Sequence, residues 1–403
     1  MFKIFVIGIA DSLLSTWQEQ LLQGCSLIVG AKRFTELVTG FADRYVEITP
    51  LKESLTALRN ALPHGNVAVL ASGDPLFFGI GRRLLTEFPE ERIAIFPALS
   101  AVQKACALFR VPWDDATITS LHGRNAAHLP GILLSRSKHL VLTDANHSPD
   151  RIADELLDYL TLIGETELPN SIRMLVAEDI GLASQRVFRG NLAEACKQRF
   201  SALNIVCLLI PDVPANPDYR FGLTEELLHH SRGLITKNEV RAATLHQLCL
   251  PETGVLWDIG AGSGSLSIEA ARANPRLTIY AVEQKEEELE NIKKNIVKFR
   301  CFNIVPVLGR APEALAGLPD PQRVFIGGSS GALPAIVPAV ASRLTEGGIL
   351  VINGVVVKTV QMAPPLMREH GFTVHTSTLQ VSRTDPDGNT KIFNPITIMT
   401  GTR

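Results

Sequence analysis

Both halves of the chain alternate short apolar runs with stretches of helical period. In the first half, Phe2–Ile9 (FKIFVIGI) and Asn66–Ser72 (NVAVLAS) are such runs, and in the second half Gly254–Gly260 (GVLWDIG) and Leu277–Glu283 (LTIYAVE) repeat the pattern. Near-continuous apolar strands separated by helices are typical of parallel sheets with both faces covered. The sequence therefore predicts an α/β fold in each half.

The chain divides at a proline-rich stretch. Its 403 residues exceed one typical core. Proline fixes φ and removes a backbone donor, so Leu208–Leu223 (LLIPDVPANPDYRFGL) is expected to be extended. We predict a first domain at 1–211, a linker at 212–220 and a second domain at 221–403. The last segments, FTVHTSTLQVSR, TDPDGNTK and NPITIMTG, predict a terminal antiparallel hairpin.

Composition argues against several classes of protein. The formal net charge of -2 gives no electrostatic basis for nucleic-acid binding. Apolar runs stay shorter than the roughly 18 residues of a membrane span, and the first residues lack a signal-peptide pattern. Six scattered cysteines without metal-ligand spacing are expected to be buried thiols in a reducing compartment, with no metal site. We expect a cytoplasmic protein without nucleic-acid or membrane partners.

A glycine loop follows the strand at Val255–Trp257. Its glycines at 260, 262 and 264 are spaced GxGxG, whereas the dinucleotide fingerprint needs a third Gly or Ala where this chain has Ser265. The spacing is similar to that of class I methyltransferases and favours S-adenosylmethionine, whose carboxylate would face free N–H groups of the loop. Glu283 ends the next strand and could accept bonds from ribose hydroxyls, which both cofactor classes require.

The strand that begins at Arg323 leads into IGGSSG. It carries neither the Asn/Asp-Pro-Pro-aromatic motif of nitrogen-directed methyltransferases nor the Pro-Cys nucleophile of cytosine enzymes. Gly327 and Gly328 either allow a tight turn or leave room for a bulky, flat substrate. Without a protein nucleophile, the substrate is expected to be electron-rich.

Longer motifs make the resemblance of the second half specific. GLITKNEVRAATLHQLCL, WDIGAGSGSLSIEAA, GRAPEALAGLPDPQRVFIGGSSG and VSRTDPDGNTKIFNPITIMTG together resemble the decarboxylating precorrin C15-methyltransferases of cobalamin biosynthesis, across 221–403. The family commonly has an acidic residue where this chain has Arg310. The resemblance implies that S-adenosylmethionine contacts Thr236, Gly260, Ala261, Gly262, Ser263, Gly264, Glu283 and Ala311.

In the first half, Val67–Gly81 (VAVLASGDPLFFGIG) places a turn-forming SGDP directly after a strand. Together with FVIGIADS, FPALSAVQKACALFRVPWDDATITSLHGR and VLTDANHSP, it resembles the tetrapyrrole methylase family, and specifically its precorrin C5-methyltransferases, across 1–211. Members bind folded S-adenosylmethionine in a cleft between two α/β subdomains. The resemblance implies a cofactor site at Gly8, Ser72, Gly73, Asp74, Pro75, Ala98, Leu99 and Ser100. The usual glycine- and proline-rich first loop is GIAD here.

Three polar residues are candidates for contacts with the substrate. A corrinoid precursor carries acetate and propionate groups, which Arg binds through charge-assisted bonds. His122 and Arg124 in LHGR, and Arg383 near the C-terminus, could serve in this way. The alternative for each is a solvated surface charge or strand end.

Both halves together resemble the fused C5,15-methyltransferases of this pathway. The resemblance implies two S-adenosylmethionine sites, one per domain, a tetrapyrrole of the precorrin-6B type as substrate, and a homo-oligomer. It also implies methylation at C5 and C15 with loss of the C12 acetate carboxyl. No side-chain nucleophile or metal is required, and no general acid or base stands out. Three alternatives stay open: a single-activity methyltransferase whose first domain only holds substrate, a non-catalytic sensor, and a nicotinamide oxidoreductase.

Overall fold

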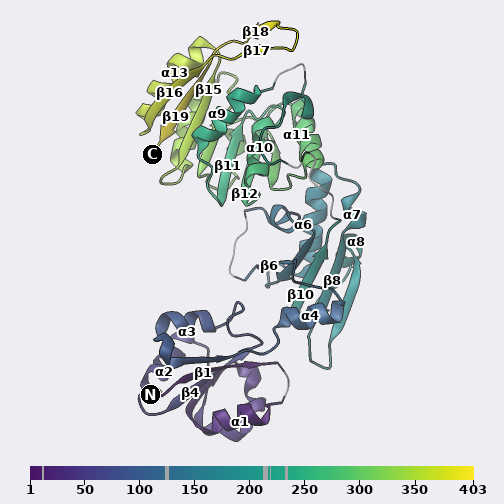
Figure 1. Ribbon diagram of the computed structural model, residues 1–403, viewed down its shortest axis with the longest axis vertical. Coiled ribbons are helices and arrows are strands. Elements are labelled where there is room, and N and C mark those ends of the chain that lie inside the picture. Colours follow the sequence, from purple (N-terminus) through teal and green to yellow (C-terminus); the bar gives the residue numbers. More distant parts are fainter. Residues whose placement is uncertain (11–12, 123–126, 212–216, 218, 232–234) are drawn as a thin grey trace.

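The computed structural model describes residues 1–10, 13–122, 127–211, 217, 219–231 and 235–403. Three main sheets follow one another along the long axis of the molecule, with the N-terminus in the first and the C-terminus in the last (Figure 1). Helices connect the strands in each part, so the predicted α/β class is confirmed.

The first sheet is wholly parallel, with the order β3-β2-β4-β1-β5. Side chains of the interior strand β1 (Ile4–Ile9) enter two different cores: Ile4 and Val6 pack on one face, Ile7 and Ile9 on the other. A strand buried on both faces needs apolar side chains at every position, as the continuous runs predicted. Its strands are β1 (Ile4–Ile9), β2 (Cys25–Gly30), β3 (Tyr45–Glu47), β4 (Asn66–Ser72) and β5 (Ile93–Phe96). Its helices are α1 (Thr16–Gln23), α2 (Leu51–Ala61) and α3 (Gly81–Glu87), with 3-10 turns η1 (Lys32–Phe34), η2 (Glu36–Arg44) and η3 (Glu90–Arg92).

The second sheet departs from the parallel prediction. Its order is β6-β7-β10-β8-β9, and only the β6–β7 pairing is parallel among the described strands. Strand β10 pairs antiparallel on both sides, although its run NIVCLL is as apolar as a parallel strand. Burial on both faces, and not strand direction, produces such a run. The strands are β6 (Thr117–Ser120), β7 (Lys138–Leu142), β8 (Arg173–Glu178), β9 (Arg186–Asn191) and β10 (Asn204–Leu209). The helices are α4 (Ala101–Phe109), α5 (Leu129–Leu133), α6 (Pro149–Leu162), α7 (Leu168–Ser171) and α8 (Leu192–Ala195).

The third sheet has the order β13-β12-β11-β14-β15-β19-β16, parallel from β13 to β15. Order reverses between β11 and β14, and ligands of open α/β sheets bind at such a point. The parallel strands are β11 (Gly254–Ile259), β12 (Leu277–Glu283), β13 (Ile304–Leu308), β14 (Arg323–Ile326) and β15 (Ile349–Gly354). The helices are α9 (Asn238–Leu248), α10 (Ser265–Ala273), α11 (Glu286–Phe299), α12 (Leu333–Arg343) and α13 (Val357–Glu369), with turns η4 (Glu225–Leu227) and η5 (Glu313–Leu315).

The predicted terminal hairpin is present and closes this sheet. β16 (Thr373–Leu379) pairs antiparallel with β19 (Ile396–Thr402), and β19 also pairs antiparallel with β15. Between them, β17 (Ser382–Thr384) and β18 (Thr390–Ile392) form a small ribbon around the DPDGN turn.

The second and third sheets share one apolar core, which runs from Leu121 to Ile398. Polar bonds cross the same boundary. The Tyr159 hydroxyl donates to the Ile304 carbonyl at 2.7 Å, and the Tyr280 hydroxyl donates to the Ala127 carbonyl at 2.8 Å. His128 Nε2 lies 2.9 Å from the Phe302 carbonyl oxygen. The two parts therefore pack as one body.

Other sequence expectations have mixed outcomes. All six cysteines are free thiols, but Cys249 is exposed and Cys196 is half-buried, so the expectation of uniform burial is wrong.

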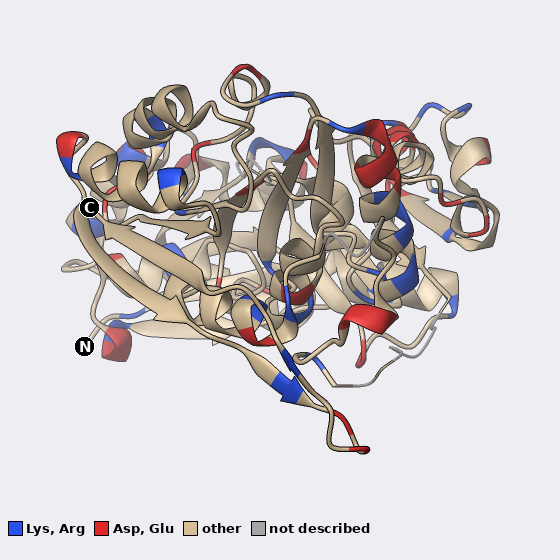
Figure 2. Ribbon diagram, turned by 90° about the horizontal axis from the view of Figure 1, so that it is seen from above, with Lys and Arg blue, Asp and Glu red and all other residues tan. Residues whose placement is uncertain are grey.

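Acidic and basic residues are interspersed along the ribbon (Figure 2). Within the described part of the chain, no helix is both long and apolar enough to cross a bilayer. Residues 212–216 and 218 of the expected linker lie outside the described residues, and the domain limits stay a prediction.

Candidate functional sites

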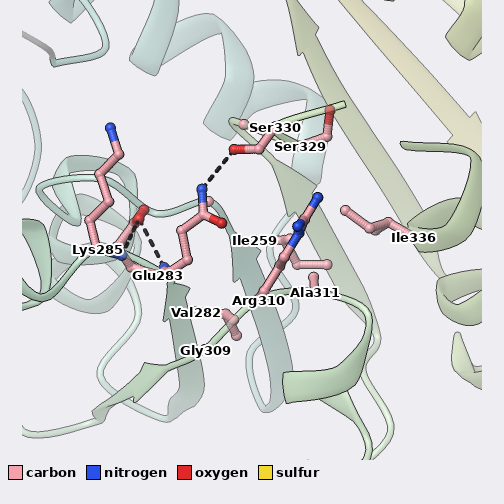
Figure 3. Close-up of a pocket in the computed structure, with 13 residues that line it drawn as sticks. Ile259, Val282, Glu283, Lys285, Gly309, Arg310, Ala311, Ser329, Ser330 and Ile336 are labelled. Atoms are coloured by element: carbon pink, nitrogen blue, oxygen red, sulfur yellow. Dashed lines mark hydrogen bonds between the residues drawn. The ribbon is translucent and has the colours of Figure 1, made fainter. Parts of the chain in front are cut away.

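A pocket opens at the carboxyl ends of β11, β12, β13 and β14 (Figure 3). Four residues singled out in the sequence line it: Gly260, Glu283, Ala311 and Gly328. Glu283 ends β12, and the other three lie in the loops that follow β11, β13 and β14, so the parallel sheet brings all four to one edge. The other lining residues are Ile259, Val282, Gln284, Lys285, Gly309, Arg310, Ser329, Ser330 and Ile336.

The Glu283 carboxylate is held by backbone donors. Gly262 N–H donates to Oε2 at 2.9 Å, and the N–H groups of Gln284 and Lys285 donate to Oε1 at 2.9 and 3.0 Å. A carboxylate oxygen has two lone-pair positions, so Oε1 is fully used and Oε2 retains one position for a further donor. The fixed carboxylate can therefore accept a bond from a ligand hydroxyl at Oε2.

The pocket floor depends on a close approach between two glycines. A Cβ on Gly260 would lie 2.2 Å from the Gly328 carbonyl oxygen, and the residue has a φ of +68°. Both facts require glycine there. Gly327 does not line the pocket, and a Cβ on it would meet the Phe325 ring at 2.9 Å. Packing against Phe325 requires a small residue at 327, and the expected contact of Gly327 with substrate stays a prediction.

The loop offers fewer free donors than its sequence predicts. The N–H groups of Gly260 and Ala261 both donate to the Val282 carbonyl, and that of Gly264 donates to the Ala261 carbonyl. Since Gly262 N–H binds Glu283, Ser263 is the loop residue, among those described, whose N–H has no internal acceptor. The donors left for a ligand are Ser263 and the first turn of α10.

Arg310 contributes a positive charge to the pocket. Its side chain points into the pocket, beside Ala311 (Figure 3). With Lys285 it supplies two cations to a site whose carboxylate is Glu283.

Several predicted contact residues do not line this pocket: Thr236, Arg383, and Ala261, Gly262, Ser263 and Gly264 of the glycine loop. Thr236 precedes α9, and its carbonyl accepts a bond from Arg241 Nη1 at 3.0 Å. Arg383, in β17, forms a two-pronged pair with Glu239 at 2.9 and 2.7 Å and a further pair with Glu225 at 2.7 Å. These bonds raise the pKa of Arg383, despite the opposing effect of burial. Its guanidinium is thus already engaged within the protein.

The segments expected to form the N-terminal site meet at the carboxyl edge of the first sheet. A Cβ on Gly8 would lie 2.1 Å from the Gly73 carbonyl oxygen and 2.6 Å from the Ala98 nitrogen. Ala98 N–H donates to the Gly73 carbonyl at 3.3 Å, and Gly73 has a φ of +62°. A Cβ on Gly73 would in turn lie 2.8 Å from Ser100 Cα.

Side chains stiffen these N-terminal loops. Asp74 Oδ1 accepts from Leu76 N–H at 2.8 Å, as expected for a turn. Ser100 caps α4 by accepting from Gln103 N–H at 3.2 Å. Arg33 Nη2 donates to Ser72 Oγ at 2.5 Å. Pro75 is buried, whereas Leu99 is exposed beside the site.

The remaining substrate candidate, LHGR, is described only in part. His122 is exposed after β6, and its Nδ1 lies 3.4 Å from Ser120 Oγ. Arg124 lies outside the described residues. Its role stays a prediction.

Sequence reasoning missed Asp258, a fully buried carboxyl next to the last residue of β11. Oδ2 accepts from Ser267 Oγ at 2.6 Å, and Oδ1 is buried without a hydrogen-bond partner among the described residues. Burial raises the pKa of Asp258 to about 7; the charge of Glu283 adds to this and the bond from Ser267 opposes it. The signal was an acid inside the apolar run VLWDIG.

Within the described residues, no group of three or more His, Cys, Asp or Glu side chains is placed to hold a metal ion.

Two family models match the chain in succession. Residues 7–196 match the tetrapyrrole (corrin/porphyrin) methylases, and residues 227–402 match the precorrin methyltransferase domain. The order agrees with the two resemblances found in the sequence.

Some curated relatives match most of the chain, and others match its second half. It is 33% identical over 379 residues to a precorrin-6Y C(5,15)-methyltransferase (decarboxylating) of Sinorhizobium sp., covering 91% of this chain and 87% of that protein. It is 32% identical over 371 residues to the protein of the same name in Mycobacterium tuberculosis, with 88% of each chain covered. A probable cobalt-precorrin-6B C(15)-methyltransferase (decarboxylating) of Pyrobaculum calidifontis is 37% identical over 185 residues, 44% of this chain and 94% of that protein.

Proposed function

The chain belongs to the family of precorrin-6Y C5,15-methyltransferases (decarboxylating), and we propose that it uses S-adenosylmethionine to methylate C5 and C15 of a precorrin-6B type tetrapyrrole, with loss of the C12 acetate carboxyl. One observation carries this proposal: the similarity extends across both domains, and each domain holds a glycine-lined loop cluster at the carboxyl edge of its sheet.

In the second domain the residues fit a nucleoside bearing a charged amino-acid tail. Glu283, fixed by three backbone donors, would accept from a ribose hydroxyl at Oε2. The free N–H of Ser263 and the first turn of α10 would face the carboxylate of the tail. Gly260 lets the backbone approach the ligand without a side chain. S-adenosylmethionine, when bound, supplies an electrophilic methyl group.

In the first domain the site would be formed by Gly8, Ser72–Pro75 and Ala98–Ser100. A Cβ on Gly8 or on Gly73 would lie only 2.1 or 2.8 Å from the nearest backbone atom, so neither position has space for a side chain. Such close backbone packing provides a rigid edge against which a ligand can be held. Exposed Leu99 would add apolar surface.

An enamine-like carbon of the reduced macrocycle is already nucleophilic, so this chain needs to supply alignment and charge stabilisation rather than a nucleophile. On decarboxylation, the electron pair of the broken C–C bond passes into the conjugated macrocycle as carbon dioxide leaves, and a proton from solvent then converts the remaining CH2 group to a methyl group. Arg310 and Lys285, at the C-terminal pocket, would favour the approach of a polycarboxylate.

Mass spectrometry after incubation with precorrin-6B and labelled S-adenosylmethionine tests the proposal. Two methyl gains and one loss of carbon dioxide are expected. Gly260→Val should abolish the C15 methylation and the decarboxylation, and Gly8→Val should abolish only the C5 methylation. If Gly8→Val leaves both methylations intact, the first domain only holds substrate. Binding without turnover would indicate a sensor, and binding of NAD in place of S-adenosylmethionine would indicate an oxidoreductase.

Two finer points belong to the same proposal. We propose a cytoplasmic homo-oligomer, because a pathway intermediate of this kind is made and used inside the cell and the family resemblance implies self-association. Light scattering coupled to size-exclusion chromatography measures the oligomeric state, and a monomeric mass across the micromolar range would refute it.

A further inference from the structure

A segment before α9, residues 223–231, lies along helix α11; we call it the strap. Three side chains of α11 bind it at intervals of about one helical turn. Lys298 Nζ donates to the Leu227 carbonyl at 2.6 Å, Asn295 binds His229, and Asn291 Nδ2 donates to Ser231 Oγ at 2.8 Å. The strap therefore runs toward the start of α11. This end of the helix lies next to Glu283, because β12 ends at Glu283 and α11 begins at Glu286.

Asn295 is the member of this row that also reaches the glycine loop. It is fully buried, and its Oδ1 accepts from His229 N–H at 2.8 Å. Its Nδ2 donates to the His229 carbonyl at 2.9 Å and to the Ser263 carbonyl at 2.9 Å. Both amide protons are thus used, one on the strap and one on the loop.

The bond from Asn295 falls on the loop residue whose N–H is left for a ligand. The N–H groups of Gly260, Ala261, Gly262 and Gly264 are used inside the protein. The orientation of Ser263 is fixed from its carbonyl side by Asn295. We propose that Asn295 is a positioning residue for cofactor binding in the second domain, aligning the Ser263 donor and coupling the loop to the strap.

The strap is anchored at its base as well. Glu269, on the helix that follows the glycine loop, accepts from Gly222 N–H at 2.6 Å and from Leu223 N–H at 2.8 Å. Its other oxygen accepts from Arg241, a fully buried side chain that also donates to the Leu223 and Thr236 carbonyls. The buried Glu269–Arg241 pair fixes the start of the strap to α10. Any displacement of His229 therefore has to change the bonds that it makes with Asn295.

This inference rests on the proposed function, so the test uses the full chain and follows both methylations. Asn295→Ala is expected to raise the KM for S-adenosylmethionine in C15 methylation by about tenfold, the effect of losing one well-made hydrogen bond, and to change kcat by less than about threefold. C5 methylation by the first domain is the internal control and should be unaffected.

Asn291→Ala is the matched variant, since Asn291 binds the strap one turn away without touching the glycine loop. Its KM should stay within about twofold of wild type. An Asn295→Ala enzyme with unchanged KM would overturn the proposal, and so would an equal rise in Asn291→Ala. A merely structural role would lower the fraction of active protein, and hence kcat, while leaving KM unchanged.

A measurement on the wild-type chain covers the case in which Asn295→Ala does not fold. Adding S-adenosylhomocysteine should slow amide hydrogen exchange in the strap at residues 226–231, because ligand at Ser263 restrains His229 through Asn295. Binding of the ligand without such protection refutes the coupling alone. If wild type binds no S-adenosylhomocysteine and Gly260→Val changes nothing, the proposed function itself fails.

Discussion

Gly260→Ala is the most discriminating single substitution in the C-terminal site. The added methyl would lie 2.2 Å from the Gly328 carbonyl oxygen and 2.8 Å from the Gly328 nitrogen. Ordinary contact would require the 327–328 turn to move by about 1 Å, since real Cβ atoms keep more than 3.0 Å from such neighbours. That turn is tied to β11 by the bond from Gly327 N–H to the Ile259 carbonyl at 2.9 Å, so it resists the shift.

Two costs add. A non-glycine residue at a φ of +68° costs about 1 kcal/mol, and forcing a methyl into packed backbone costs about 1–3 kcal/mol. The free energy of unfolding should therefore fall by about 2–4 kcal/mol. Because Gly260 and Gly328 both line the pocket, a displacement of about 1 Å should also lower C15 kcat/KM by about a hundredfold.

Gly262→Ala is the matched control. Gly262 has a φ of +56°, but a Cβ there meets no atom within 4 Å. It should lose only about 1 kcal/mol. Urea unfolding followed by tryptophan fluorescence, together with the kinetics of C15 methylation, measures both variants. Equal losses in the two would show that backbone conformation alone matters, and would refute the role assigned to the Gly260–Gly328 contact.

Three further outcomes follow from the same structure. Gly8→Ala, whose methyl would lie 2.1 Å from the Gly73 carbonyl oxygen, should reduce C5 methylation with little change at C15; equal loss at both sites in the mass assay would contradict this. Burial lowers the pKa of His128 from 6.5 to about 4. The folded protein therefore resists protonation of His128, and the free energy of unfolding should fall by up to about 3 kcal/mol as the pH drops from 6.5 toward 4. Urea unfolding of His128→Gln at a series of pH values should lack this pH dependence. Arg383→Met should cost about 1 kcal/mol through its partly exposed pairs with Glu225 and Glu239 and leave the KM for the tetrapyrrole unchanged, whereas a raised KM would restore Arg383 as a substrate contact.

Local patterns predicted much of this molecule. Apolar runs marked the strands of the first and third sheets, and the DPDGN turn marked the terminal hairpin, because burial and turn geometry leave direct signatures in neighbouring residues. They did not give the direction of β10, since an apolar run records burial alone. They also did not reveal that Asp258 would be buried with a pKa of about 7.

The sequence by itself determined the α/β class, the two glycine loops and the acid at Glu283, since each depends on residues within one short segment. Only the tertiary structure decided which of them meet. Gly260 contacts Gly328, and Gly8 contacts Gly73, across 65 or more positions of chain. The tertiary structure also decided that Arg383 forms its ion pair with Glu239, and that Asn295 joins the strap to the glycine loop. Contacts between distant segments depend on how sheets and helices pack, and no local pattern of residues records that packing.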